Sequence, residues 1–161
     1  MDVSAKIATP GSLISALDQA RRAGKKIVFT NGCFDILHVG HVRYLAAARS
    51  AGDLLVVGLN SDASVRSIKG DRRPVVGQDQ RAEVLASLMC VDFVVVFDEP
   101  DPLRLIQMLK PDVLVKGADW GEENIVGAEF VKSRGGKIVR AKLVPEASTS
   151  RIIERILRRF C

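Results

Sequence analysis

The two histidines of the chain lie three residues apart in a glycine-containing segment. His38 and His41 lie on either side of Gly40, after an apolar run at residues 26–30 and at the start of a helical pattern at residues 38–51. Residues three apart share one side of a helical turn. The free N–H groups and the positive dipole end of a helix start suit a phosphate, and Gly40 leaves room for one. We therefore predict an anion site at this turn.

A metal pair is the competing interpretation of the two histidines. Zinc sites use a third protein ligand, usually a carboxylate or a thiolate. Cys33 is the nearest thiol, and its position directly after Gly32 favours packing. The chain contains neither the P-loop motif nor the dinucleotide-binding glycine motif. We expect no metal ion held by protein side chains.

Three other loops contain groups that bind phosphates or hydroxyls. Cations of the loop at residues 60–79 could clamp a phosphorylated substrate or neutralise a transferred phosphoryl group, or they could belong to a mobile solvated loop. A carboxylate in the loop after residue 116 could hold a sugar hydroxyl. Hydroxyls at residues 148–150 form an ordinary helix cap or a second anion cradle, and taken alone the cap is favoured. The residues concerned are Lys69, Arg72, Arg73, Arg81, Lys116, Gly117, Asp119, Ser148, Thr149 and Ser150.

These loops need a scaffold, and the hydrophobic pattern predicts one. Apolar runs typical of strands alternate with helical patterns, and Ser12 and Gly24 are expected to cap and end the first helix. Runs of Val, Ile and Leu without alternation indicate strands buried on both faces, hence a parallel sheet. Such sheets bind ligands beyond the carboxyl ends of their strands. We predict strands at residues 26–30, 54–59, 93–97, 113–116 and 137–143, with helices at 12–23, 38–51, 80–89, 102–109, 125–134 and 150–160.

The expected fold is an open, doubly wound α/β domain with a five-stranded parallel sheet, similar to a Rossmann fold. A length of 161 residues with 47% hydrophobic content suits a single domain at 1–161. It would comprise a helical N-terminal segment at about 12–23 and a core at about 25–157.

Composition restricts the partner and the compartment. A formal net charge of +5 indicates an anionic partner. The 5% aromatic content offers no platform on which bases could stack, so we expect no nucleic acid partner. A basic nucleic-acid-binding module is therefore the minor alternative. Short apolar runs and an N-terminus unlike a signal peptide predict a cytoplasmic protein without a membrane partner. The widely separated Cys33, Cys90 and Cys161 fit a reducing compartment.

Several segments give the chain a resemblance to a known family. Gly32-Cys33-Phe34-Asp35, His38-Val39-Gly40-His41 and the segment 148–151 resemble the signature of the cytidylyltransferase-like nucleotidyltransferase superfamily. The stretches T-N-G-C-F-D, K-G-D-R-R-P and V-K-G-A-D-W, in this order, resemble more narrowly its heptose 1-phosphate adenylyltransferase branch. The similar stretches extend over residues 25–156.

The resemblance implies transfer of AMP from ATP to D-glycero-β-D-manno-heptose 1-phosphate, with Mg²⁺, giving pyrophosphate and ADP-heptose for lipopolysaccharide cores. The acceptor phosphate is ionised near neutral pH, so positioning and charge neutralisation suffice without a general base. By the same resemblance His38, His41 and Lys69 are catalytic, and Asp35 contacts the sugar or ties down its loop. Nucleotide contacts are implied for Thr30, Asn31, Gly32, Cys33, Phe34, Gly40, Arg81, Lys116, Gly117, Asp119, Ser148, Thr149 and Ser150, and sugar-phosphate contacts for Asp35, Asn60, Arg72 and Arg73.

The resemblance leaves one alternative activity and implies an upstream enzyme. Glycerol-3-phosphate cytidylyltransferase activity is the alternative within the superfamily, because that branch shares the histidine pair and a similar Gly-Asp-x-Trp loop. The heptose branch is commonly fused to a sugar kinase, and nothing kinase-like occurs in these residues. We therefore expect a separate heptose 7-phosphate kinase upstream, or else an excised domain, and a homo-oligomer.

Overall fold

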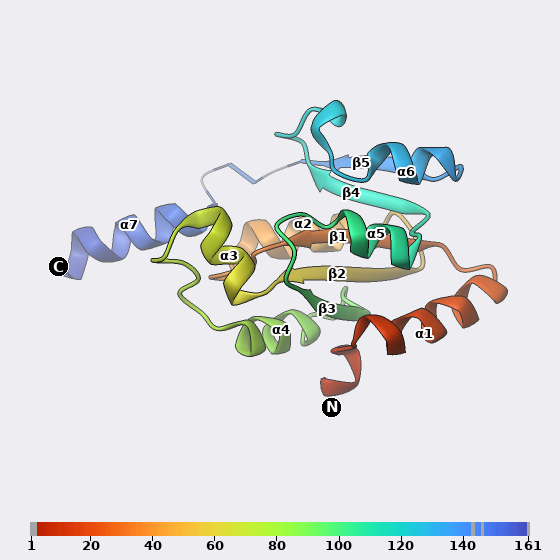
Figure 1. Cartoon of the computed structure of the whole chain (residues 1–161). Coiled ribbons are helices and arrows are strands. Elements are labelled where there is room, and N and C mark those ends of the chain that lie inside the picture. The colour runs from red at the N-terminus through yellow and green to blue at the C-terminus, as the bar shows by residue number, and fades with distance from the viewer. Residues whose placement is uncertain (1–2, 143, 146, 161) are drawn as a thin grey trace.

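The computed structural model describes residues 3–142, 144–145 and 147–160, and within them five parallel strands form one sheet. The strand order is β3-β2-β1-β4-β5, so β3 and β5 are the two edges (Figure 1). This confirms the predicted five-stranded, doubly wound parallel sheet. The strands are β1 (Ile27–Gly32), β2 (Leu54–Asn60), β3 (Phe93–Phe97), β4 (Val113–Gly117) and β5 (Lys137–Ala141).

Helices cover both faces of the sheet. Side chains of α2 and α4 pack in one apolar cluster with Val57 and Val94, whereas α1, α5 and α6 pack in a second cluster with Phe29 and Leu114. Adjacent strand residues thus point into opposite clusters, which explains why the strand sequences are apolar without alternation. The helices are α1 (Pro10–Arg22), α2 (Val39–Arg49), α3 (Asp62–Lys69), α4 (Gln78–Ala86), α5 (Leu103–Leu109), α6 (Ala128–Ser133) and α7 (Thr149–Phe160), with short 3₁₀ turns η1 (Ser4–Lys6) and η2 (Glu122–Asn124).

The direction of winding reverses at β1. The chain proceeds outward from β1 to β2 and β3, and then returns to place β4 on the other side of β1. The loops that follow β1 and β4 consequently diverge to opposite faces and leave a crevice between the carboxyl ends of these strands. This topology selects the β1 and β4 loops as the walls of a binding site before any side chain is considered.

Two sequence predictions about helices were wrong. The first helix begins at Pro10 rather than residue 12, because the Thr9 hydroxyl accepts the Ser12 N–H and so caps it; Gly24 ends it as predicted, at φ +72°. The predicted loop at residues 60–79 contains α3, whose N-terminus is capped by the Ser61 hydroxyl accepting from the Ser64 N–H. The other helices and strands begin and end within a turn of their predicted bounds.

Residues near the N-terminus cover one edge of the sheet. Ile7 forms an isolated parallel bridge with Val94 of β3, and the Ala8 N–H donates to the Val94 carbonyl. The ammonium of Lys6 donates to the carbonyls of Leu88 and Val91 and so ties this segment to the end of α4. The sequence analysis did not predict this contact.

Two sequence predictions fall on positions beyond the described part of the chain: Leu143, the end of the predicted last strand, and Cys161. In the described part, no helix combines the length and the apolar character needed to cross a bilayer.

Candidate active site

A cleft opens at the carboxyl ends of β1 and β4, where the winding reverses. It consists of two adjoining cavities of about 490 Å³ and about 460 Å³. We call the first the Asn60 side and the second the Asp119 side. Residues that line only the Asn60 side include Asp35, Asn60, Arg73 and Ser150, and residues that line only the Asp119 side include His38, Gly40, Gly117, Asp119 and Ser148. Residues common to both are Asn31, Gly32, Cys33, Phe34, His41, Lys69, Lys116, Trp120 and Thr149.

The two histidines stack on each other at the start of α2. His38 is the N-cap residue with extended backbone, and its ring centroid lies 3.8 Å from that of His41, with 25° between the planes. Phe34 supports the pair by placing its ring edgewise to His41 at 5.2 Å. The Nδ1 atoms of both imidazoles are buried and have no hydrogen-bond partner among the described residues. Unpartnered buried polar atoms are rare, and the two histidines that carry them stand at the start of a helix that lines the cleft.

The histidine pair is uncharged at neutral pH in the free protein. Burial, and to a lesser extent the neighbouring His38, lowers the pKa of His41 to about 4. Burial also lowers the pKa of His38 below its ordinary value. Two stacked neutral imidazoles avoid mutual repulsion, and they can donate N–H bonds to an anion or bind a proton when an anion arrives.

The structure requires glycine at position 40 for a different reason from the predicted one. A Cβ atom at this position would lie 2.9 Å from the His38 ring and 3.1 Å from the Ala147 Cβ. The missing side chain therefore makes room for the His38 imidazole and for the segment before α7, and not for an open phosphate path. Gly32 is similarly crowded, because a Cβ there would lie 3.0 Å from the Phe34 ring.

Lys116 supplies a buried cation common to both sides of the cleft. Its ammonium donates to the Asn31 side-chain carbonyl at 2.5 Å, and no salt bridge to a carboxylate joins it within the described chain. Burial lowers the pKa of this amine to about 8. A buried cation with only a neutral partner is costly unless an anion joins it. The arrangement therefore suits an anionic ligand at the junction of the two sides.

Asp35 ties down the loop before α4. Its buried carboxylate accepts the Val75 and Val76 N–H groups and pairs with the Arg73 guanidinium at 2.5 Å. Burial by itself would raise the pKa of Asp35, but the bonds from Val76, Val75 and Arg73 outweigh it and hold the pKa below its ordinary value. Of the two roles considered for Asp35, the structure favours fixation of the loop, because its oxygens are already occupied.

Arg81 joins three loops and does not reach into the cleft. Its fully buried guanidinium donates to the carbonyls of Cys33, Asn60 and Val76 and to the Asp62 carboxylate. Four of its five N–H bonds are therefore used within the protein, and Arg81 lines neither side of the cleft. The predicted phosphate contact is corrected to a structural role.

Thr30 and Arg72 also lie outside the cleft. The Thr30 side chain is buried, and its hydroxyl shares hydrogen bonds with the Tyr44 hydroxyl and the Val115 carbonyl, which connects β1, α2 and β4. Its predicted nucleotide contact is corrected for this reason. Arg72 is exposed and lines neither cavity, so its predicted contact with the sugar phosphate is not present in this conformation.

The start of α7 reaches the cleft from the end of the chain. The Ser148 hydroxyl accepts the Arg151 N–H, which is a cap interaction, and the Thr149 hydroxyl donates to the Ile36 carbonyl. Ser148 and Ser150 line opposite sides. The cap favoured by the sequence is present, and the same helix start faces the cleft with its free N–H groups.

Trp120 is the principal cleft residue that the sequence analysis did not select. Its indole is about half exposed, at 48%, and lines both sides. The V-K-G-A-D-W stretch was identified there, but only the lysine, glycine and aspartate were assigned chemistry. Because Trp120 is the single tryptophan of the chain, its fluorescence can report ligand binding in the cleft.

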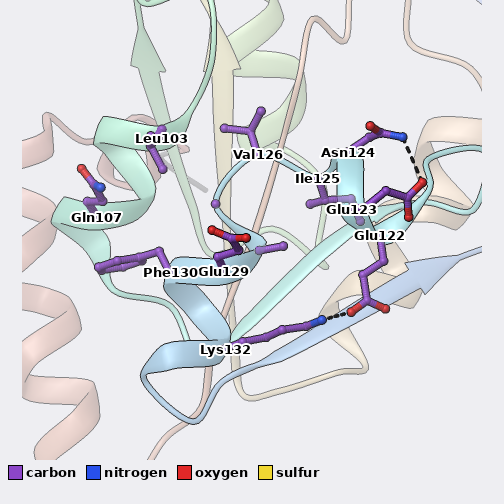
Figure 2. A pocket seen from close by; sticks show the side chains of 12 residues that line it. Leu103, Gln107, Glu122, Glu123, Asn124, Ile125, Val126, Glu129, Phe130 and Lys132 are labelled. Carbon is purple, nitrogen blue, oxygen red and sulfur yellow. Dashed lines mark hydrogen bonds and ion pairs between the residues drawn. The ribbon is translucent and has the colours of Figure 1, made fainter.

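A larger cavity lies elsewhere. A groove of about 770 Å³ lies between α5, η2 and α6, and three glutamates and one lysine are its charged groups (Figure 2). It contains neither histidine nor arginine and thus does not suit a phosphate. Nor does any group of three or more His, Cys, Asp or Glu residues that could hold a metal ion occur among the residues described.

A family model described as cytidylyltransferase-like matches residues 29–155, which include both histidines and the start of α7. The chain belongs to the cytidylyltransferase-like family. The bifunctional protein HldE of Syntrophotalea carbinolica is 54% identical over 160 residues, 99% of this chain and 33% of the relative. HldE of Geotalea uraniireducens is 56% identical over 155 residues, 96% of this chain and 32% of the relative. The chain therefore spans about a third of the length of these relatives.

Two solved structures share the fold of this chain. The lipopolysaccharide core biosynthesis protein of Thermoplasma volcanium superposes with a TM-score of 0.60 at 27% identity, covering 75% of this chain and 98% of that one. Pantoate–β-alanine ligase of Francisella tularensis gives a TM-score of 0.60 at 19% identity, covering 95% of this chain and 79% of that one, and shows the fold alone.

Because Arg81 bonds three loops, we expect its replacement to lower the stability of the folded chain strongly. In Arg81→Met, three carbonyls and Asp62 lose the buried guanidinium that donates to them, so we expect the free energy of unfolding to fall by about 3 kcal/mol or more without any ligand. Urea denaturation measures this. Arg72→Met is the matched control, and its exposed position predicts a change within about 0.5 kcal/mol. Equal stability of the two variants would contradict the structural role of Arg81.

The low pKa of His41 predicts a pH-dependent stability. The unfolded chain binds a proton near pH 6.5 and the folded chain only near pH 4, so stability is complete above pH 6.5 and is lost as the pH falls toward 4. We expect wild type to lose about 1–2 kcal/mol more than His41→Gln between pH 7.5 and pH 5. Urea unfolding of both proteins at the two pH values measures the difference. Parallel losses would contradict burial of a neutral imidazole.

Proposed function

We propose that this chain transfers AMP from ATP to a heptose 1-phosphate and releases pyrophosphate. The observation that carries the proposal is the stacked pair of neutral histidines at a helix start. It lines the same cleft as Lys116, which is largely buried and forms no salt bridge among the described residues. This combination provides a site for several phosphates, and the family membership indicates nucleotidyl transfer as its chemistry. The name of the solved relative from Thermoplasma volcanium supports a sugar acceptor for lipopolysaccharide cores.

The two sides of the cleft divide the substrates. ATP binds on the Asp119 side, with its ribose hydroxyls near Asp119 and its phosphates at the start of α2 and α7. The sugar phosphate binds on the Asn60 side, beside Asn60 and Arg73. His41, Lys69 and Lys116 line both sides and so meet the reacting phosphates. This division also explains why two lysines, Lys69 and Lys116, line both sides of the cleft.

The reaction requires little covalent participation by the protein. An oxygen of the acceptor phosphate attacks the α-phosphorus of ATP in line, and the bond from that phosphorus to the bridging oxygen of pyrophosphate breaks. Negative charge accumulates on the α-phosphate that is being transferred and on pyrophosphate. The imidazole N–H groups stabilise this charge by hydrogen bonds, and the Lys116 ammonium stabilises it by its own charge. The rigid Arg81 and Asp35 contacts hold the surrounding loops, so the charges need not reorganise during the step.

Mg²⁺ fits this site as a companion of ATP. Because the described residues offer no carboxylate cluster for a metal ion, the phosphate oxygens would supply most ligands, as is common for this ion. It would neutralise charge on the triphosphate. We further propose that the reaction takes place in the cytoplasm, that a heptose 7-phosphate kinase activity supplies the acceptor, and that the chain acts as a homo-oligomer.

Pyrophosphate release tests the activity. The assay combines ATP or CTP, with Mg²⁺, with D-glycero-β-D-manno-heptose 1-phosphate or glycerol 3-phosphate. We expect release only with ATP and the heptose phosphate, and a rate lowered about 10²–10³-fold in His41→Asn. Release with CTP and glycerol 3-phosphate would instead establish the cytidylyltransferase alternative. A folded protein that is silent with every pair would refute both.

Lys116 predicts opposite effects on activity and stability. Lys116→Met removes a cation aimed at the reacting phosphates, and we expect kcat/KM to fall about 10²-fold or more. The same change removes a buried charge with only a neutral partner, so the free energy of unfolding should stay equal or rise. In wild type, kcat/KM should decline above pH 8, because the Lys116 ammonium of the enzyme without substrate then loses its proton.

Steady-state kinetics and urea denaturation measure the two effects. Lys116→Arg is the matched control, since it retains the charge and should retain more of the activity than the Met variant. A Met variant that is both inactive and strongly destabilised would indicate a structural role and contradict the assignment.

A further inference from the structure

The helix α7 carries an apolar stripe that the described chain does not cover. Ile152, Ile153, Ile156, Leu157 and Phe160 recur at the spacing of one helix face, and no residue of α7 is buried. Phe160 is 80% exposed and Leu157 is 56% exposed. Figure 1 shows that α7 extends away from the sheet and the other helices. Burying such a stripe is favourable, so it calls for a covering surface.

The polar side of α7 is strongly basic. Arg158 lies opposite the apolar stripe, Arg155 and Arg159 lie beside it, and Glu154 is the single acidic residue of the helix. At 100° per residue, Arg155 and Arg159 are positioned along one border of the stripe and Glu154 beyond the other. The surface that covers α7 should therefore be apolar at its centre and acidic at the rim.

The groove of Figure 2 has these properties. Leu103, Val126 and Phe130 contribute its apolar lining, and Leu103 and Val126 are each 37% exposed. Glu122, Glu123 and Glu129 line the same groove, with Lys132 as its cation, paired to Glu122. The groove is thus net acidic, the Glu123 and Glu129 side chains are exposed, and no residue of α7 lines it.

We propose that α7 of one copy of this chain docks in the groove between α5 and α6 of a second copy. The apolar stripe covers Leu103, Val126 and Phe130, and Arg155 and Arg159 meet the carboxylates of Glu123 and Glu129. If both copies exchange their helices, the two contacts are equivalent and the assembly closes as a dimer with two-fold symmetry. The proposal is independent of the substrate of the cleft.

Pairing of two α7 helices by their apolar stripes is less suited to the observations. A helix of this length is about 18 Å long and about 10 Å wide, so two of them cover far less than the roughly 1,200 Å² that a stable interface buries. Such pairing would also leave the acidic groove uncovered. Exchange of helices places two helix–groove contacts in one interface and matches charges at both.

Sedimentation velocity of the full chain with charge-reversal variants tests the interface. The groove variant is Glu123→Arg with Glu129→Arg, the helix variant is Arg155→Glu with Arg159→Glu, and the combined variant carries all four changes. We expect wild type to form a dimer and each pair of changes to weaken dimerisation at least about tenfold, or about 1.4 kcal/mol. In the combined variant the charges match again, so dimerisation should return to near the wild-type level.

Met89→Glu is the matched control for a change on an exposed surface, because Met89 is 97% exposed and lies outside both surfaces; it should leave dimerisation unchanged. Far-ultraviolet circular dichroism verifies that each variant folds, and the single changes Glu129→Arg and Arg159→Glu replace any pair that does not.

Three results would overturn the proposal. Wild type that stays monomeric at every soluble concentration would exclude self-association, and co-sedimentation of that monomer with phosphatidylglycerol vesicles would assign α7 to an anionic surface instead. A groove variant that dimerises like wild type would indicate contact between two α7 helices. A combined variant that remains monomeric would show that the two surfaces do not meet.

Discussion

The buried guanidinium of Arg81 holds the working parts of this protein together. It bonds the carbonyl of Cys33 after β1, the carbonyl of Asn60 after β2, and the carbonyl of Val76 ahead of its own helix. Loops that follow different strands have no ladder of hydrogen bonds to fix their separation, so a shared donor has to do it. The ion pair to Asp62 balances the charge. The separation of these loops, and with it the shape of the cleft, therefore depends on a side chain that does not itself line the cleft.

The cleft contrasts with this well-satisfied support. Around Arg81 and Asp35, donors and acceptors are matched within the protein, whereas the histidine Nδ1 atoms and the Lys116 ammonium are left with too few partners. Polar groups in such a state raise the free energy of the folded chain. They persist here because a rigid surrounding holds them in place, and under the proposed function a phosphate-bearing ligand would supply a charged partner for Lys116. The contrast separates the residues that build the site from those that serve the ligand.

The sequence was sufficient for the strands and for most of the cleft, but not for the tasks of individual polar residues. Unalternating apolar runs predicted the parallel sheet, and the rule that such sheets bind at strand ends located His41 and Lys116 correctly in one place. The helix α3 was missed because Gly70 and the polar residues around it look like a loop, while the Ser61 cap that starts the helix is a single residue. Arg81 and Thr30 were given ligand contacts because burial depends on tertiary packing, which a local pattern does not contain.

The bridge between Ile7 and Val94 affects how copies of this chain can meet. A parallel sheet has two open edges, and unpaired backbone groups there can recruit strands from other molecules. The segment around Ile7 occupies one such edge, on β3. At the opposite edge, β5 carries the exposed side chains of Lys137 and Arg140, and closely spaced charges discourage a strand from adding. With strand addition disfavoured on both sides, further assembly of this protein is directed to its helices and loops, where recognition relies on side chains rather than on the backbone.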